Sequence, residues 1–162
     1  MTAPFTEDHD VFRRTVRRFL EAEVAPHAEV WEAAGRIPRE VFRRMGELGL
    51  LGITAPPEYG GQGGDLFFAV AFLEELPRSL MGGFAASVSV QQFMATAHIA
   101  SAGSEALKKR YWAPSLRGEK VGALAVTEPD AGSDVAALRT TAVRKDGVFL
   151  VRYLDLPGRP PD

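Results

Sequence analysis

Apolar residues recur at helical spacing along much of the chain. The clearest case is the segment 7–24, whose apolar positions fall three or four residues apart and therefore share one face of a helix. These positions are Phe12, Val16, Phe19 and Leu20. Thr6 precedes the segment as a candidate N-cap, and Pro26 predicts a kink or a restart before further helix at 27–34.

Four later segments carry the same signals, with proline or glycine at their boundaries. They span 38–48, 66–76, 84–100 and 105–112. The stretch 55–65 holds two prolines and four glycines and must be a loop. Helices joined by short loops predict a mainly α fold that opens with an up-and-down helical bundle.

Four arginines, Arg13, Arg14, Arg17 and Arg18, lie on a second side of the first predicted helix. Such a cluster is able to bind anions. A solvated face with i,i+4 pairing between Asp10 and Arg14 explains it more simply, and this is our interpretation.

The pattern changes after Pro114. The runs 121–126, 140–143 and 148–151 are short and apolar and resemble strands, and Lys145-Asp146-Gly147 predicts a hairpin turn between the last two. We therefore expect a helical domain at 1–118, followed by the first strands of a truncated β-domain at 119–151. A divergent tail rich in Pro, Gly and Arg follows at 152–162.

The stretch 79–104 contains no Asp, Glu, Lys or Arg, and it is longer than the ~18 apolar residues that suggest a membrane span. Glycine, serine, glutamine and threonine interrupt it, however, and polar side chains are costly in hydrocarbon. We interpret it as the central helix of a soluble bundle and predict no membrane span.

Composition narrows the function classes. A formal net charge of −2 leaves no basic excess for binding nucleic acid. The absence of cysteine excludes disulfides, thiolate metal ligands and a cysteine nucleophile. The three histidines lie far apart in the sequence, so we predict no metal site. The first residues lack the basic and apolar regions of a signal peptide, and we expect a cytoplasmic protein.

The most informative segment is Thr127-Glu128-Pro129-Asp130-Ala131-Gly132-Ser133-Asp134. A threonine hydroxyl and backbone N–H groups around a glycine suit an anion or a heterocycle. Ser133 beside Asp134 also resembles part of a hydrolase triad, but no histidine follows. On the residues alone, a surface turn is the simpler interpretation.

This segment resembles the signature of the acyl-CoA dehydrogenase family. Three other stretches resemble that family in the same order and spacing. They are 57–63 (Pro-Glu-Tyr-Gly-Gly-x-Gly), 73–76 (Leu-Glu-Glu-Leu) and 103–111 (Gly-Ser-Glu-x-x-Lys-Lys-x-Tyr), the last followed by Gly118-Glu119. The resemblance extends from about residue 6 to residue 150.

The resemblance implies a helical N-terminal domain, a middle β-domain and a C-terminal four-helix bundle, with FAD between the last two. Full-length relatives assemble as homo-oligomers and oxidise an acyl-CoA to the trans-2-enoyl-CoA. A carboxylate removes the α-proton, the β-hydrogen leaves as hydride to the flavin, and an electron-transferring flavoprotein accepts the electrons. Acyl-CoA and that flavoprotein are therefore the implied partners.

Cofactor contacts are implied for Leu124, Val126, Thr127, Gly132 and Ser133. Thr127 matches the residue whose hydroxyl and backbone bond the edge of the isoalloxazine, where they favour the negative charge that develops on reduction. Ser133 matches a position that contacts the flavin phosphates or the bound acyl-CoA. Leu124 departs from the aromatic residue that many members carry. The uncharged helix at 84–100 falls in the region that walls the acyl-chain pocket, and its small and apolar surface suits an alkyl chain. Packing in the core explains that surface equally well.

The family's catalytic glutamate lies in the C-terminal bundle, so we assign no catalytic residue here, and Glu128 has no claim to that role. After Val151 the sequence departs from the family's flavin-contacting strand. We therefore expect a truncated or frameshifted flavoprotein that is inactive alone and binds FAD weakly or not at all. The alternatives are a non-catalytic helical interaction module, or a fragment of a related acyl-CoA oxidase or flavin monooxygenase.

Overall fold

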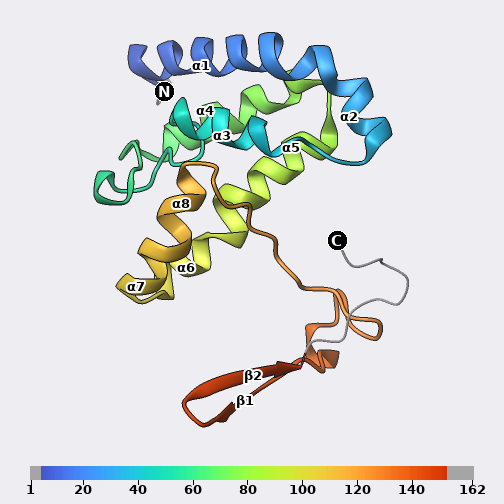
Figure 1. Cartoon of the computed structure of the whole chain (residues 1–162). Coiled ribbons are helices and arrows are strands. Elements are labelled where there is room, and N and C mark those ends of the chain that lie inside the picture. The colour runs from blue at the N-terminus through green and yellow to red at the C-terminus, as the bar shows by residue number, and fades with distance from the viewer. Residues whose placement is uncertain (1–4, 153–162) are drawn as a thin grey trace. The chain divides into compact units, whose positions relative to one another are not determined.

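The computed structural model describes residues 5–152 and divides the chain into two units, residues 1–124 and residues 125–162. The first unit is helical (Figure 1). Its helices are α1 (Glu7–Phe19), α2 (Ala28–Ala34), α3 (Arg39–Glu47), α4 (Leu66–Glu75), α5 (Gly82–Ser89), α6 (Ala97–Ala102), α7 (Glu105–Leu107) and α8 (Ala113–Leu116). Three π-helical segments, Leu20–Val24, Val90–Ala95 and Lys108–Trp112, continue α1, α5 and α7. The predicted mainly α fold is confirmed.

The core of the first unit gathers the apolar faces of α1, α3, α4 and α5. Leu20, Met45, Phe72 and Phe84 are among its fully buried side chains. Burying a side chain of this size stabilises the fold by roughly 1.5–3 kcal/mol. The stripe predicted from the spacing of apolar residues in the first helix lies in this core, with Phe12 at its partly buried edge.

Most helix ends lie where the sequence placed them. Gly35 and Gly49 end α2 and α3 with positive φ angles of 64° and 71°, which glycine adopts without steric cost. The Ser104 hydroxyl caps α7 by accepting from the Leu107 N–H at 3.3 Å. The helix predicted at 105–112 extends further than expected, because Pro114 lies inside α8 near its N-terminal end.

The helix predicted at 84–100 is present as a succession of α5, the π-helical segment Val90–Ala95 and α6. One expectation for the middle of the chain is wrong. The run 121–126 forms no strand. Within the described part of the chain its backbone takes a side-chain partner instead, since the Gly122 N–H donates to Oε1 of Gln91 at 2.5 Å.

The second unit contains an antiparallel hairpin of β1 (Thr141–Lys145) and β2 (Val148–Arg152). In its register, Lys145 pairs with Val148. Asp146 and Gly147 form the turn, both with positive φ, at 51° and 82°. A two-residue turn of this kind matches the right-handed twist of the strands, so the predicted hairpin is confirmed. All but one residue of the predicted tail at 152–162 lies outside the described residues.

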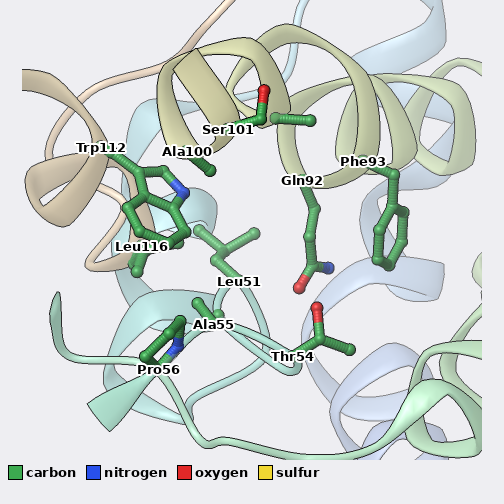
Figure 2. A pocket seen from close by; sticks show the side chains of 12 residues that line it. Leu51, Thr54, Ala55, Pro56, Gln92, Phe93, Ala100, Ser101, Trp112 and Leu116 are labelled. Carbon is green, nitrogen blue, oxygen red and sulfur yellow. The ribbon is translucent and has the colours of Figure 1, made fainter. Parts of the chain in front are cut away.

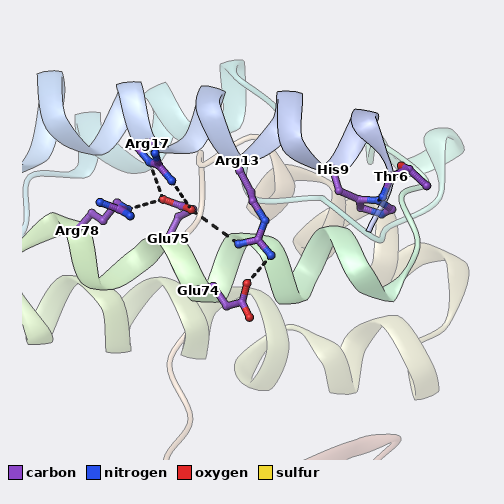
Figure 3. Close-up of polar contacts among 7 residues, drawn as sticks. All are labelled: Thr6, His9, Arg13, Arg17, Glu74, Glu75 and Arg78. Carbon is purple, nitrogen blue, oxygen red and sulfur yellow. Dashed lines mark hydrogen bonds and ion pairs between the residues drawn. The ribbon is translucent and has the colours of Figure 1, made fainter. Parts of the chain in front are cut away.

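A charge cluster fastens α1 to α4 (Figure 3). The Glu75 side chain is buried and accepts from Arg17 at 3.0 and 3.1 Å and from Arg78 at 2.6 Å. Arg13 pairs with Glu74 and lies 3.7 Å from Glu75. The interpretation of the arginines as a solvated face is therefore wrong for Arg13 and Arg17, because α4 presents two carboxylates to them.

Glycines let α3 and the segment after α8 approach backbone to backbone. A Cβ added to Gly46 would lie under 3.0 Å from backbone atoms of Arg117, and one added to Gly118 would meet those of Phe42 equally closely. Gly118 also has a φ of 69°. The route of the chain from 115 to 118 thus requires glycine on both sides of the contact.

No helix among residues 5–152 is both long enough and apolar enough to cross a bilayer.

The Glu75 cluster predicts an acid-dependent contribution to stability. The hydrogen bond from Arg17 is the largest cause that lowers the pKa of Glu75 below its ordinary value of 4.5. The paired Glu75 carboxylate therefore contributes fully to the free energy of unfolding above pH 4.5. This contribution is lost as the pH falls through the lowered pKa of Glu75. Glu75→Gln should cost about 1–3 kcal/mol near pH 7 and flatten the stability profile below pH 4.5.

Urea unfolding of both proteins between acidic and neutral pH measures this. Glu74→Gln is the matched control, because Glu74 is 53% exposed and pairs only at the surface. If the two substitutions lower the free energy of unfolding equally at every pH, the buried Glu75 carboxylate does not have the stabilising role described here.

The glycine contact predicts that Gly46→Ala destabilises the protein. Alanine ordinarily stabilises a helix interior by roughly 0.5–1 kcal/mol over glycine. Here the added methyl must displace the Arg117 backbone, and we expect a net loss of about 1–3 kcal/mol. Thermal unfolding followed by circular dichroism measures it. In the control Gly82→Ala, the new Cβ meets no atom within 4 Å, so no loss is expected. If Gly46→Ala is as stable as Gly82→Ala, the close contact between Gly46 and the Arg117 backbone is not present in solution.

Candidate functional site

The uncharged helix borders a cavity of about 460 Å³ in the first unit, here called the α5 cavity. Its lining is uncharged throughout and comes from the loop before α3, from α3 and α5, and from the segment after α8. These residues are Ile37, Phe42, Ala86, Ser87, Val90, Val121, Gly122, Ala123 and Leu124. Such a surface suits an alkyl chain better than a charged ligand.

The sequence of α5 explains why one of its sides is open. Phe84 and Val88 are four residues apart and fully buried in the core, so they fix which face points inward. Ala86, Ser87 and Val90 lie on the side that borders the cavity. The small side chains at 86 and 87 leave the space that larger residues would fill.

A second cavity of about 390 Å³ is lined by residues of the segment 51–56 and of the helical stretches 92–101 and 112–116 (Figure 2). Trp112 and Leu116 from the last helical stretch lie on one side of it and Phe93 on the other, and Ser101 lies beside Ala100 between them. Gln92 crosses its edge, accepting from the Ile53 N–H at 3.1 Å and donating to the Leu50 carbonyl at 3.3 Å. None of the site residues implied by the resemblance lines this cavity.

The loop at 127–134 is built around a small turn in the second unit. The Glu128 N–H donates to the Ala131 carbonyl at 2.8 Å, and the Ala131 N–H donates back at 3.2 Å. The Asp134 carboxylate accepts from the Ala136 N–H at 3.2 Å and caps the short helical turn Val135–Ala137. The loop therefore has a defined shape of its own.

The implied cofactor residues fall in two places. Thr127, Gly132 and Ser133 belong to this loop and Val126 directly precedes it, and all four are exposed. A Cβ added to Gly132 would meet no atom within 4 Å, so the surface there is open to a flat or bulky group. Leu124 belongs to the first unit, lines the α5 cavity and is 37% exposed.

Glu128 has a structural role that sequence reasoning missed. Its side chain is buried and accepts from the Arg139 N–H at 2.7 Å, the Thr140 N–H at 2.9 Å and the Thr140 hydroxyl. The Thr140 hydroxyl is the largest cause that lowers the pKa of Glu128, followed by the Arg139 N–H. The carboxylate thus ties the loop to the start of the hairpin. No local signal reveals this contact, because the partners lie 11 and 12 residues away.

The histidines form no metal centre in the described part of the chain, where no group of three or more His, Asp or Glu side chains is able to hold an ion. His9 is buried at the start of α1. Its Nδ1 accepts from the Thr6 N–H at 2.9 Å, which leaves Nε2 as the proton donor toward Asp65, 3.1 Å away. His9 therefore joins the start of α1 to the cap of α4.

A helical unit with this element order, followed by a hairpin unit, defines a recognisable class of protein. The sequence profile of the acyl-CoA dehydrogenase N-terminal domain matches residues 6–119. The chain therefore belongs to the acyl-CoA dehydrogenase family.

Individual relatives agree with this assignment. The chain is 41% identical to the mitochondrial long-chain specific acyl-CoA dehydrogenase of Sus scrofa over 88% of its own length and 33% of the relative. The crystal structure of an acyl-CoA dehydrogenase from Geobacillus kaustophilus superimposes with a TM-score of 0.87 at 36% identity, covering 94% of this chain and 40% of that one.

A third relative was solved with the cofactor. The Bacillus anthracis acyl-CoA dehydrogenase, complexed with FAD, superimposes with a TM-score of 0.84 at 33% identity, covering 93% of this chain and 26% of that one. The chain thus spans a third or so of the length of the relatives that it matches.

The Glu128 contacts predict that Glu128→Gln loosens the loop without unfolding the helical unit. An amide keeps one acceptor but introduces donors that face the N–H groups of residues 139 and 140. Amide hydrogen exchange should show reduced protection of Arg139 and Thr140 and unchanged protection of the Phe72 region. Because the pKa of Glu128 is lowered, the wild-type contacts persist at neutral pH and weaken as the pH falls through that pKa.

Asp130→Asn is the control, since Asp130 is exposed and pairs with Arg139 only at the surface, at 3.0 Å. If it reduces protection as much as Glu128→Gln does, the buried carboxylate is not what holds the loop.

Proposed function

We propose that this chain supplies the N-terminal wall and the first flavin-contacting loop of an FAD-dependent acyl-CoA dehydrogenase site. The observation that carries the proposal is the loop at 127–133. Its shape is fixed from behind by Glu128, while Thr127, Gly132 and Ser133 are exposed on it. A pre-formed loop loses little entropy when it binds a ligand.

The residues of this loop fit the isoalloxazine edge of FAD. The Thr127 hydroxyl can donate or accept a hydrogen bond, and Gly132 leaves open space for close approach of a ring or a phosphate. FAD would supply the hydride acceptor when bound. The part of this chain is to hold and orient the ring and to place donors where negative charge develops.

The α5 cavity fits the alkyl end of an acyl thioester. Its lining carries no charge, and Ser87 supplies the one hydroxyl among the side chains that line it. Desolvation of an alkyl chain there contributes about 25 cal/mol for each Å² of apolar surface buried. Ser133 is the residue of this chain proposed to contact the bound acyl-CoA or the flavin phosphates.

Turnover requires a base that removes the α-proton of the thioester. The resemblance assigns that base to the C-terminal bundle, in a part of the relatives that these 162 residues do not match. Electron transfer to an electron-transferring flavoprotein and assembly as a homo-oligomer belong to the same proposal for the whole protein. There are two alternative functions, a helical interaction module and a related oxidase or monooxygenase. The tests below name the results that would favour each of them.

The first test measures FAD binding. Isothermal titration of the 162-residue chain with FAD should give weak binding, and Thr127→Val should weaken it by about fivefold, since one hydrogen bond to the ring is worth about 1 kcal/mol. Thr127→Ser should restore most of the affinity. Thr141→Val, at an exposed strand position, is the matched control. Folded protein without any FAD affinity would favour the helical interaction module.

The second test measures turnover. The same 162 residues, expressed alone with excess FAD and octanoyl-CoA, should reduce no dye acceptor. Dye reduction that depends on octanoyl-CoA would show that a base exists within this chain. Reduction of oxygen in place of the dye would favour the oxidase or monooxygenase class.

A further inference from the structure

Gln91 holds the segment that leads out of the first unit. Its side chain is 1% exposed, although it is polar. The amide nitrogen donates to the Lys120 carbonyl at 3.0 Å and to the Ser115 carbonyl at 3.4 Å, while Oε1 accepts from the Gly122 N–H at 2.5 Å. One side chain therefore binds three backbone groups between residues 115 and 122.

The geometry explains why the apolar run 121–126 forms no strand. A side-chain amide carries the same donor and acceptor as a peptide unit. The Gln91 amide bonds both the Lys120 carbonyl and the Gly122 N–H, as a neighbouring strand would. It thereby gives hydrogen-bond partners to two backbone groups of a part-buried segment.

The π-helical segment Val90–Ala95 lets neighbouring glutamines act on different partners. Gln92 bonds Leu50 and Ile53 in the loop after α3, whereas Gln91 bonds the segment after α8. The Thr96 hydroxyl donates to the Gln91 carbonyl at 2.9 Å, which satisfies an acceptor in the irregular turn. Such π-bulges occur frequently at functional sites.

The segment held by Gln91 is also a wall of the α5 cavity. Val121, Gly122, Ala123 and Leu124 line that cavity, and Gly122 is the residue bonded at 2.5 Å. A shift of this segment would change the width of the cavity opposite Val90. The loop at 127–134, for which we propose contact with the flavin, begins a few residues later.

We infer that Gln91 is a positioning residue of the acyl-CoA dehydrogenase-type site. It fixes the backbone of residues 115–122, which contributes to one wall of the α5 cavity and precedes the loop at 127–134. It contacts neither substrate nor flavin. This inference rests on the proposed function for its role in ligand binding, and on the hydrogen bonds of Gln91 for the positioning itself.

Gln91→Glu tests the inference because its effect depends on pH. A protonated carboxyl offers one donor and one acceptor and mimics the amide, whereas a carboxylate offers acceptors only and faces the Lys120 carbonyl with no donor. At about pH 7.5 the Gly122 amide should lose protection from hydrogen exchange by about tenfold, and at about pH 4.5 much of it should return. Comparison with wild type at each pH removes the effect of the nearby Glu119 and Lys120 charges.

Gln92→Glu is the matched control, since it makes the same change one residue away and faces the other loop. It should leave the Gly122 amide protected. Gln91→Met, an apolar residue of similar length, is the second variant and should lose the protection at both pH values. Protection of the Phe72 and Phe84 amides reports that each variant is folded.

Octanoyl-CoA binding separates positioning from a purely structural role. Gln91→Glu should weaken the affinity by about tenfold near pH 7.5 and less near pH 4.5, while Gln92→Glu stays near wild type. Unchanged Gly122 protection in folded Gln91→Glu and Gln91→Met overturns the inference. If the Gly122 amide loses protection but the affinity for octanoyl-CoA is unchanged, Gln91 has no positioning role in the ligand site. If wild type shows the Gln91-dependent protection but no octanoyl-CoA affinity, the proposed function of the cavity fails, and the role of Gln91 in ligand binding fails with it.

Discussion

The route of the chain from 115 to 124 is the constraint on which the candidate site depends. Gly46 and Gly118 allow this segment to touch α3 backbone to backbone, and Gln91 binds it from the π-helical segment Val90–Ala95. Both contacts are steric or directional, so they define one path where hydrophobic burial alone would permit several. The same path makes one wall of the α5 cavity and delivers Leu124 to it.

A second device joins the helices that carry this arrangement. Glu75 receives hydrogen bonds from Arg17 on α1 and from Arg78 in the 3-10 segment Leu76–Ser79 that follows α4, while His9 joins the two helix starts. A buried carboxylate is costly unless it is paired, so these contacts specify how α1 lies along α4. In the second unit, Glu128 ties the loop at 127–134 to the N–H groups of residues 139 and 140. Each of these carboxylates fixes the local geometry through its hydrogen bonds.

Much of the fold was predictable from the sequence, because the signals are local. The apolar stripe around Val16, the helix-ending Gly35 and the Asp146-Gly147 turn each depend on residues within a few positions. The contacts that build the site are not local. Gln91 bonds Gly122 31 residues away, and Arg17 bonds Glu75 58 residues away. Neither spacing nor composition encodes such partners, which is why the arginine face and the run at 121–126 were misjudged.

The central claim is that the loop at 127–133 receives the flavin ring and the α5 cavity receives the acyl chain. A titration of the isotopically labelled 162-residue chain by NMR tests this most directly. FAD should shift the amides of Thr127, Gly132 and Ser133, and octanoyl-CoA should shift those of Ala86, Ser87 and Val90. Shifts confined to the other cavity, around Trp112 and Ser101, would contradict the account.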